Sequence, residues 1–516
     1  MKAYLLYPAR DFDWQAAPPW SAEALVQDLG LQTLFDAMAN SDQFLLDTVR
    51  RVLLSATSDL DTITYRQAIL RDCLANASVV RKIYDLAVDA IQSEKRDFWW
   101  FSTKSPYLNL GHAINVLEMF VGMLASLKGM AEQHASEFHS EGFRRLLAAL
   151  ERELEDKYLA TVRHHLEQLK FPGGIMVSSV LGKGIKGDNY VLCQPRQTEQ
   201  GWLARIFGPR AEEYTFQLHP RDESGFRALS DLKDRGLNLA ANAVAQSRDH
   251  VLSFFQLLRR ELAFYLGCLN LHEHLVERGK TTCFPVPKPA AERSHTVRGL
   301  YDICLALCQS PPIVGNDLDA DGKGLVIITG ANQGGKSTFL RSIGLAQLMM
   351  QCGMFVPAES FCADVREGIF THFKREEDAT MQSGKLDEEL GRMSDVTDRL
   401  TGNSFVLFNE SFAATNEREG SEIARQIISA LLEKGVKVFF VTHLYECARG
   451  FFEKGMDNVI FLRAERRPDG ERTFRLLKGE PLQTSHGEDL YHRIFSAPAA
   501  CGLPSECGGM LVSKLD

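Results

Sequence analysis

Residues 325–338, Leu-Val-Ile-Ile-Thr-Gly-Ala-Asn-Gln-Gly-Gly-Lys-Ser-Thr, decide the fold class of this chain. The apolar, β-branched start predicts a buried strand, and the pattern GxxxxGKS that follows predicts a loop leading into a helix. Glycines let successive backbone N–H groups turn toward phosphate oxygens, and the helix N-terminus adds positive potential. We therefore predict a nucleotide site, rather than a glycine turn without a ligand, formed by Gly330, Ala331, Asn332, Gln333, Gly334, Gly335, Lys336, Ser337 and Thr338.

A second apolar run, residues 405–410, ends in the polar pair Asn409 and Glu410. In this loop chemistry Lys336 reaches the β- and γ-phosphates, and the Ser337 hydroxyl binds Mg²⁺. An acid at the end of a neighbouring strand supports the metal, and a glutamate after it polarises the attacking water. The predicted metal ligands are therefore Ser337, Asn409 and Glu410. Asn409 offers an oxygen but no negative charge, so we expect weaker metal binding than an aspartate would give.

A third apolar run, residues 438–443, ends in His443, which is expected to sense the γ-phosphate. The predicted catalytic residues are Lys336, Glu410 and His443. The alternatives are a solvated strand-end carboxylate for Glu410 and a polar cap for His443. The glycine loop, the Asn409–Glu410 pair and His443 follow one another in the order typical of P-loop enzymes. This order favours a catalytic role for Glu410 and His443 over the two alternatives.

Outside this region the chain is mostly helical in pattern. Apolar residues three and four apart recur over 21–39, 42–54 and 67–94, and Ser41 and Asp42 have the character of a helix cap. From about 110 to 169 the period stays helical and would reach on the order of 90 Å as one rod. Helical patterning returns over 224–278. The predicted domains are a helical core over 1–109, lever arms over 110–170 and 224–280, a small antiparallel β module over 171–223, and an α/β domain over 295–516.

The β module is predicted from short alternating runs over 175–180, 190–194, 202–207 and 214–218. Its segment 182–187, Gly-Lys-Gly-Ile-Lys-Gly, lacks a following helix. It is therefore either a hairpin loop with solvated lysines or a contact to backbone phosphates. The aromatic segment 98–101 is either a packing corner or a stacking platform for bases.

Composition bounds the function classes. The chain has 516 residues and a net charge of −9, so binding of nucleic acid through a general positive field is not expected. The start has no signal-peptide pattern and no run of about 18 apolar residues occurs, so we predict a cytoplasmic protein with no membrane partner. Eleven scattered cysteines without a CxxC pair indicate reduced thiols. Cys304 and Cys308 could share a metal, but core thiols fit better because no third and fourth ligand accompanies them.

The segment from about 295 to 500 resembles the ATPase domain of the MutS family, the DNA mismatch repair ATPases. The resemblance lies in the loop TGANQGGKST and in the segments 312–318, 353–358, 369–371, 473–477 and 485–487. It implies ATP and Mg²⁺ as cofactors, with Asn316 near the adenine. The first 290 residues are similar to MutS lever and clamp regions. The implied fold is an ABC-type P-loop α/β ATPase domain at the C-terminus, preceded by a mostly α-helical lever region with a small antiparallel β clamp insertion.

Two departures from the MutS pattern stand out. The first is Asn409 in place of an aspartate. The second lies in residues 378–389, where the family places a signature that reaches the partner subunit's nucleotide: Ser383 and Gly384 are present, but the following Ser/Thr-x-Phe is absent. Lys385 either supplies charge to the partner's γ-phosphate or is solvated. No counterpart of the family's N-terminal mismatch-reading domain, with its Phe-x-Glu wedge, is visible.

These observations leave three hypotheses. The first is a homodimeric Mg²⁺-dependent ATPase that clamps duplex DNA, whether mismatched, branched or otherwise distorted. The second is a nucleotide-gated scaffold with little hydrolysis, which the two departures favour. The third keeps the ATPase but places a protein partner between the arms, because the β module has near-balanced charge.

Overall fold

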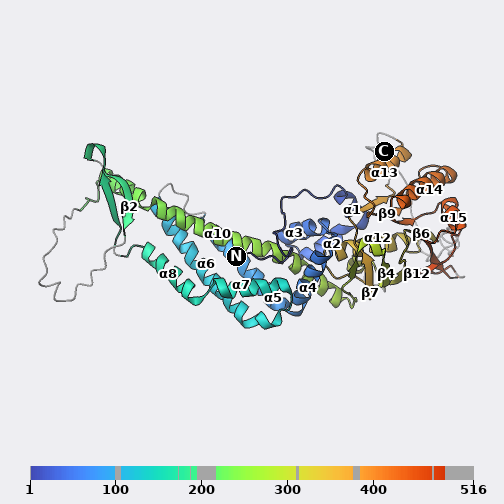
Figure 1. The fold of residues 1–516 in the computed structure, drawn as a ribbon, viewed down its shortest axis with the longest axis horizontal. Coiled ribbons are helices and arrows are strands. Elements are labelled where there is room, and N and C mark those ends of the chain that lie inside the picture. The colour runs from blue at the N-terminus through green and yellow to red at the C-terminus, as the bar shows by residue number, and fades with distance from the viewer. Residues whose placement is uncertain are drawn as a thin grey trace, which may run out of the picture. The chain divides into compact units, whose positions relative to one another are not determined.

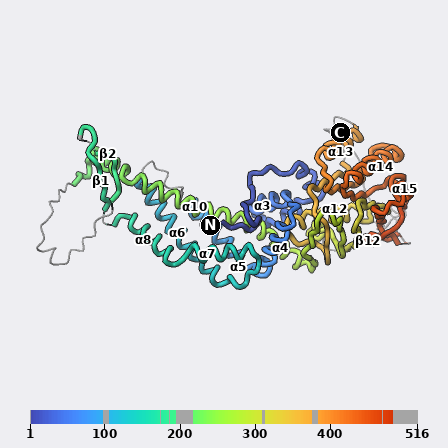
Figure 2. The backbone as a smooth tube through the Cα atoms, viewed as in Figure 1, coloured from blue at the N-terminus to red at the C-terminus, as the bar shows by residue number. Residues whose placement is uncertain are grey.

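The computed structural model describes residues 2–98, 106–172, 174–185, 187–193, 217–308, 313–375, 384–467 and 470–482. The chain forms two compact units (Figures 1 and 2). The helical unit contains residues 1–20, 32–280 and 348–355. The α/β unit contains residues 21–31, 281–347 and 356–516. The predicted domain ranges stay predictions, and α1 (Ala22–Leu29) belongs to the α/β unit although it lies within the stretch 1–109.

The helical unit is built around one long helix, α10 (Glu223–Glu277), whose 55 residues span about 80 Å at 1.5 Å per residue. The helix predicted over 224–278 is therefore confirmed. Its C-terminal half is buried, and it packs against α3, α5 and α6 (Figure 1). The other helices of this unit are α2 (Leu31–Ala39), α3 (Gln43–Leu54), α4 (Leu60–Ala75), α5 (Ala77–Phe98), α6 (Pro106–His134), α7 (Glu141–Glu153) and α8 (Asp156–Leu169).

Two predicted helices are interrupted in the structure. Residues 110–169 form α6, α7 and α8 instead of one rod, because Asp72 accepts hydrogen bonds from the backbone N–H groups of His139 and Ser140 and so fixes a turn before α7. Residues 67–94 divide between α4 and α5 at Asn76. The cap predicted at Asp42 is confirmed, since its carboxylate accepts from the N–H groups of Phe44 and Leu45 at the start of α3.

The stretch 106–137, which includes α6, is long and apolar enough to cross a membrane by length and composition, with a mean hydropathy of 1.5 in its most apolar window. It contains no uninterrupted run of about 18 apolar residues, which is the basis on which no membrane partner is predicted, so its length and composition alone do not overturn that prediction. Half of that window is buried inside the protein, where α6 packs on α5 and α10. A core helix has the same composition, so the predicted absence of a membrane partner stays a prediction.

The described part of the β module is one antiparallel pair, β1 (Met176–Leu181) and β2 (Gly187–Cys193). The segment 182–187 includes the short turn that joins the two strands. Val177 of β1 packs against Gly236 of α10, where a Cβ atom would lie 2.8 Å from a Val177 methyl group. The predicted strand over 202–207, residues 214–216 of the strand predicted over 214–218, and Trp99, Trp100 and Phe101 of the aromatic segment lie outside the described residues. Residues 217 and 218 are described and are not in a strand.

The α/β unit contains a six-stranded sheet in the order β12-β11-β6-β10-β9-β8. All neighbours in it are parallel except the antiparallel pair β11 and β12. The central strands are buried on both faces, as their continuous apolar sequences predict. The strands are β6 (Leu325–Gly330), β8 (Ile369–Phe373), β9 (Phe405–Asn409), β10 (Lys437–Val441), β11 (Val459–Arg466) and β12 (Arg472–Lys478).

A smaller four-stranded sheet has the order β3-β7-β4-β5. Its strands are β3 (Val286–Lys288), β4 (His295–Leu300), β5 (Asn316–Asp319) and β7 (Ser360–Asp364). The helices of this unit are α1, α11 (Ile303–Cys308), α12 (Lys336–Gln351), which ends in the helical unit, α13 (Lys385–Thr397), α14 (Glu417–Glu433) and α15 (Tyr445–Glu453).

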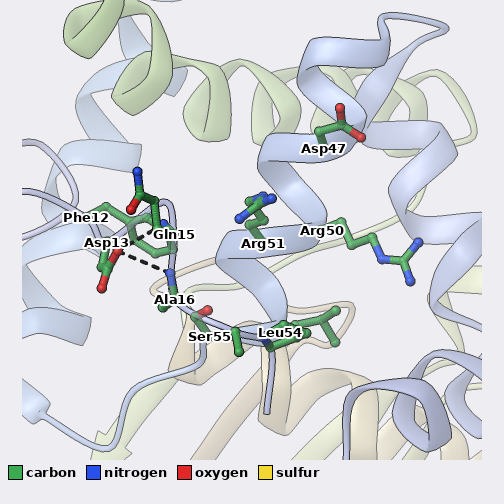
Figure 3. A pocket seen from close by; sticks show the side chains of 11 residues that line it. Phe12, Asp13, Gln15, Ala16, Asp47, Arg50, Arg51, Leu54 and Ser55 are labelled. Atoms are coloured by element: carbon green, nitrogen blue, oxygen red, sulfur yellow. Dashed lines mark hydrogen bonds between the residues drawn. The ribbon is translucent and has the colours of Figure 1, made fainter. Parts of the chain in front are cut away.

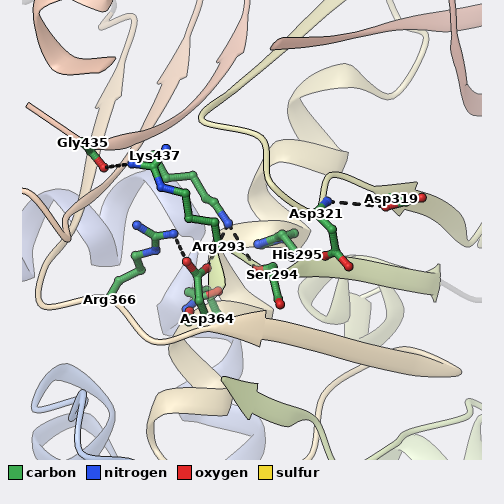
Figure 4. Close-up of polar contacts among 10 residues, drawn as sticks. Arg293, Ser294, His295, Asp319, Asp321, Asp364, Arg366, Gly435 and Lys437 are labelled. Atoms are coloured by element: carbon green, nitrogen blue, oxygen red, sulfur yellow. Dashed lines mark hydrogen bonds and ion pairs between the residues drawn. The ribbon is translucent and has the colours of Figure 1, made fainter. Parts of the chain in front are cut away.

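A buried ion cluster joins the two sheets (Figure 4). Lys437, at the start of β10, lies 2.9 Å from the carboxylate of Asp364, at the end of β7. The same carboxylate pairs with Arg366, and all three side chains are at least 97% buried. His295 lies fully buried beside them among the rings of Phe361, Phe405 and Phe439. The cluster ties the N-terminal end of β10 to the smaller sheet.

Helix α1 packs against β8, an edge strand of the large sheet. Asp28 pairs with Arg375 at 3.1 Å, and Leu29 contacts Gly344 of α12. The buried thiol of Cys304 donates to the carbonyl of Gly30 at 3.4 Å. Cys304 is thus a core thiol, as predicted, whereas Cys308 is exposed, so the prediction of a core thiol is wrong for that residue. Within the ranges described above, no group of three His, Cys, Asp or Glu side chains could hold a metal.

Candidate functional site

The loop 330–335 connects β6 to α12 in a backbone conformation that depends on glycine. Gly330 and Gly335 have φ values of 107° and 87°. A Cβ atom on Gly330 would lie 2.9 Å from the backbone N of Ala464 in β11. Gln333 also has a positive φ, 60°, which is strained for a residue with a side chain and is typical of functional loops.

Lys336, the first residue of α12, folds back over this loop. Its ammonium donates to the carbonyl oxygens of Gly330 at 2.9 Å and Ala331 at 3.0 Å. The side chain is 5% exposed, and this burial lowers the pKa of Lys336 to about 8. Glu410 opposes that shift, while Arg472 adds to it. A phosphate group at the loop would supply the negative charge that this buried cation needs.

Ser337 and Asn409 meet across the ends of β6 and β9. The Ser337 hydroxyl donates to the Asn409 side-chain oxygen at 2.8 Å. Two neutral oxygen atoms in contact, with the Glu410 carboxylate next in sequence, are hard ligands of the kind that Mg²⁺ binds together with phosphate oxygens and water. The donor set therefore fits Mg²⁺, with one negative charge fewer than an aspartate at 409 would give.

Glu410 and His443 form a pair at the ends of β9 and β10. His443 Nε2 lies 2.9 Å from the Glu410 carboxylate, and this hydrogen bond holds the pKa of Glu410 below its usual value. The backbone N–H of Glu410 donates to Val441, and its φ is 54°. Both side chains are about one-third exposed, so water can reach them. An ionised, accessible carboxylate is suited to orient or polarise a water molecule.

A cavity of about 440 Å³ lies beside the loop. Asn316 lines it, but its amide group is engaged by β12: it donates to the carbonyl of Phe474 at 3.1 Å and accepts from Leu476 N–H at 2.8 Å. Phe474 has a φ of 59° and its side chain lies 3.6 Å from the position of a Cβ on Gly335. Asn316 therefore holds Phe474 at the cavity.

Sequence reasoning did not single out several residues that line this cavity. They come from the end of β4 and from α11, from the segment before β5, from α12 and from β12, which are far apart in the sequence. No spacing rule joins them, although Ile313, Val314 and Phe474 lie in segments that carry the resemblance, 312–318 and 473–477. The cavity residues without a predicted role are Leu300, Tyr301, Asp302, Leu305, Ile313, Val314, Phe339, Ser342 and Phe474.

Of the predicted trans signature, Ser383 lies outside the described residues, and Gly384 is the N-terminal cap of α13. Residues 485–487 also lie outside them. Among the residues that the structure describes, no atom lies within 4 Å of a Cβ position on Gly384. Its predicted contact with a partner's nucleotide stays a prediction.

A separate cavity of about 510 Å³ lies in the helical unit (Figure 3). Arg50, Arg51 and Asp47 of α3 line one side, and the segment 12–18 lines the other. Asp13 of that segment accepts from the backbone N–H groups of Gln15 and Ala16. None of the residues predicted for nucleotide chemistry lines this cavity.

The three strand ends gather Lys336 and Ser337, Asn409 and Glu410, and His443 at one edge of a parallel sheet, the edge at which α/β proteins bind ligands. Two protein-family models match this chain. The model of the MutS2 N-terminal domain matches residues 58–278, and the model of MutS domain V matches residues 326–487. The chain belongs to the MutS family, so the predicted family is confirmed.

Among similar proteins, the DNA mismatch repair protein MutS of Thermotoga maritima is 38% identical over 134 residues, 26% of this chain and 17% of that protein. MutS of Porphyromonas gingivalis is 34% identical over 231 residues, 43% of this chain and 25% of that protein. Human MutS protein homolog 4 is 31% identical over 165 residues, 32% of this chain and 18% of that protein. The chain thus spans a quarter or less of the length of these relatives.

Proposed function

We propose that this chain is a Mg²⁺-dependent ATPase of the MutS type that dimerises through its α/β units and acts on DNA. The observation that carries the proposal is the convergence of the Lys336 loop, the Ser337–Asn409 oxygen pair and the Glu410–His443 pair at adjacent strand ends. The family membership supports the same chemistry.

Each side chain then has one task. On binding, the phosphates of ATP replace the loop carbonyls as partners of Lys336. Ser337 and Asn409 would hold Mg²⁺, which would supply positive charge to the phosphates. Glu410 orients the attacking water, and His443 keeps Glu410 ionised and reports on the γ-phosphate. Phe474, which Asn316 holds in place, closes the cavity, and we propose that this cavity binds the adenine of ATP.

Hydrolysis can be tested through Glu410→Gln, which keeps the size of the side chain and removes its charge. We expect ATP to bind as in the wild type while phosphate release falls by roughly 10²-fold or more, since a positioned base contributes 10² to 10⁴. Glu433→Gln, an exposed change at the end of α14, is the matched control. Equal turnover of Glu410→Gln and the wild type would show that Glu410 is not the base.

A second candidate is a nucleotide-gated scaffold that hydrolyses ATP slowly. Asn409 supports it, because the Ser337–Asn409 pair lacks the negative charge that would bind Mg²⁺ tightly. Asn409→Asp separates the two functions. A rise in turnover and a fall in the Mg²⁺ concentration needed would indicate that the natural chain is tuned for slow hydrolysis.

DNA is the proposed partner of the helical unit, and the β1–β2 pair is the proposed clamp module. Relatives that match this chain are named DNA mismatch repair proteins. Homoduplex, mismatched, branched and single-stranded DNA should be compared for binding and for stimulation of ATP hydrolysis. If none of the four binds, the partner is not DNA, and a protein partner becomes the leading alternative.

A further inference from the structure

The backbone around Glu410 is held in an uncommon conformation. Glu410 and Phe412 both have positive φ values, 54° and 64°, and neither is glycine. Such a conformation is strained for a residue with a side chain and persists only where surrounding contacts enforce it. Among the contacts that enforce it are those of β8 and α13, which lie outside the loop 330–335 and the strand ends that carry Asn409, Glu410 and His443.

From the β8 side, His372 holds Ser411. The ring nitrogen Nδ1 of His372 lies 2.8 Å from the Ser411 hydroxyl, which also faces the main-chain oxygen of His372. The His372 ring stacks on Phe412, with centroids 5.3 Å apart and planes 18° apart. Ser411 and Phe412, the two residues that follow Glu410 in this turn, are fully buried, so these contacts are shielded from water.

From the α13 side, Glu389 holds Phe412. One oxygen of its carboxylate accepts from the backbone N–H of Phe412 at 3.0 Å, and its main-chain oxygen accepts from His372 Nε2 at 3.0 Å. Glu389 is fully buried, and its second carboxylate oxygen has no hydrogen-bond partner among the residues the structure describes. Burying a carboxyl group with an unsatisfied oxygen costs free energy. A function of Glu389 would offset this cost.

We propose that Glu389 and His372 are positioning residues that fix the backbone of Glu410 and couple it to α13. This inference rests on the proposed ATPase function. Helix α13 starts at Lys385, directly after the Ser383-Gly384 pair. A shift of this helix would move Glu389, release the N–H of Phe412 and let the strained turn relax. The position of α13 then determines whether Glu410 faces the nucleotide.

Three variants of Glu389 and its helix test this coupling. Glu389→Leu removes the acceptor and keeps the approximate size, so kcat should fall by roughly 10-fold or more, with the affinity for ATP within about twofold of the wild type. Glu389→Gln keeps an oxygen acceptor and should restore most of the rate. Asp395→Asn is the control, because it also removes one negative charge from α13 but at an exposed position.

A readout that does not depend on hydrolysis separates this inference from the proposed function. Hydrogen exchange of the Phe412 amide should rise in Glu389→Leu and stay low in Glu389→Gln and Asp395→Asn. If the exchange changes as expected but the wild type does not hydrolyse ATP, the positioning inference stands and the ATPase proposal fails. Unchanged exchange and unchanged kcat in Glu389→Leu would overturn the inference, and so would a loss of rate in Glu389→Leu that Glu389→Gln does not restore.

His372 is tested by His372→Phe, which keeps a ring to stack on Phe412 and removes both hydrogen bonds. We expect the same pattern as for Glu389→Leu: reduced kcat, retained ATP affinity and faster exchange at Ser411 and Phe412. A melting temperature close to that of the wild type distinguishes positioning from a general loss of fold. Wild-type kcat in this variant would exclude His372 from the coupling.

Discussion

At the scale of single residues, burial sets the charge state of Lys336 and a hydrogen bond sets that of Glu410. Lys336 has a lowered pKa because it is taken out of water and finds only carbonyl oxygens as partners. Glu410 has a lowered pKa because His443 donates to it, an effect larger than the opposing burial. Without ligand, Lys336 thus loses its proton more readily than an exposed lysine does, and Glu410 stays ionised to lower pH than an exposed glutamate does.

The affinity for ATP should therefore fall as the pH rises through about 8. Below that value Lys336 is protonated and can bind phosphate; above it the neutral form predominates, and at pH 9 the affinity should drop roughly tenfold. Titration of a fluorescent ATP analogue at pH 7, 8 and 9 measures this. Lys336→Arg, which stays charged over the range, should lose the pH dependence. The same slope in both proteins would mean that another group titrates.

Asp364 pairs with two buried cations, Lys437 and Arg366. Asp364→Asn should destabilise the protein by about 3–5 kcal/mol, because it removes the negative charge that pairs with both buried cations. Urea denaturation measures the change, with the exposed Glu292→Gln as a control expected within about 1 kcal/mol of the wild type. A small effect of Asp364→Asn would show that water or relaxation compensates for the lost charge.

At the scale of elements, the loop after β9 is enclosed by helices on two sides. Gly420 of α14 approaches the turn so closely that a Cβ atom would lie 2.4 Å from the carbonyl oxygen of Phe412. Both groups belong to the backbone, so neither can rotate away. The closeness of α14 is thus a condition for the conformation of Glu410.

Gly420→Ala should lower stability by about 1–3 kcal/mol, as overpacking of a buried site does, and should also slow ATP hydrolysis. Gly391→Ala is the matched control, because Gly391 lies in α13 with nothing within 4 Å of a Cβ position. That change should stabilise the protein by about 0.5–1 kcal/mol through helix propensity. Similar effects of the two substitutions would show that α14 can move without affecting the turn.

The sequence predicted elements whose information is local. The strand and loop over 325–338 and the 55-residue helix α10 carry their periodicity and glycines within one stretch. The break before α7 was missed because Asp72, which fixes it, lies far from it in the sequence. Contacts of Glu389 and His372 with the turn at Glu410 were missed for the same reason, since only the folded sheet brings β8, β9 and α13 together.

At the scale of the whole molecule, the net charge of −9 opposes contact with another polyanion. DNA binding should therefore depend on nucleotide and on salt. We expect binding by fluorescence anisotropy in ATP, little without nucleotide, and affinity that falls steeply between 50 and 200 mM salt as counterions are released. Lys336→Ala should abolish both this binding and ATP-dependent dimerisation measured by light scattering. A salt-insensitive complex would favour a protein partner instead.

The path of the chain through the two units has a consequence for how such a protein can be divided or recombined. The chain changes unit five times, at residues 20/21, 31/32, 280/281, 347/348 and 355/356. A fragment that starts at Thr281 would lack α1, with its Asp28–Arg375 pair, and would expose Met350, Phe355 and their neighbours, which are buried in the intact chain. A cut or a cross-over at residue 280 therefore divides both units, because residues 21–31 of the α/β unit lie before it and residues 348–355 of the helical unit lie after it.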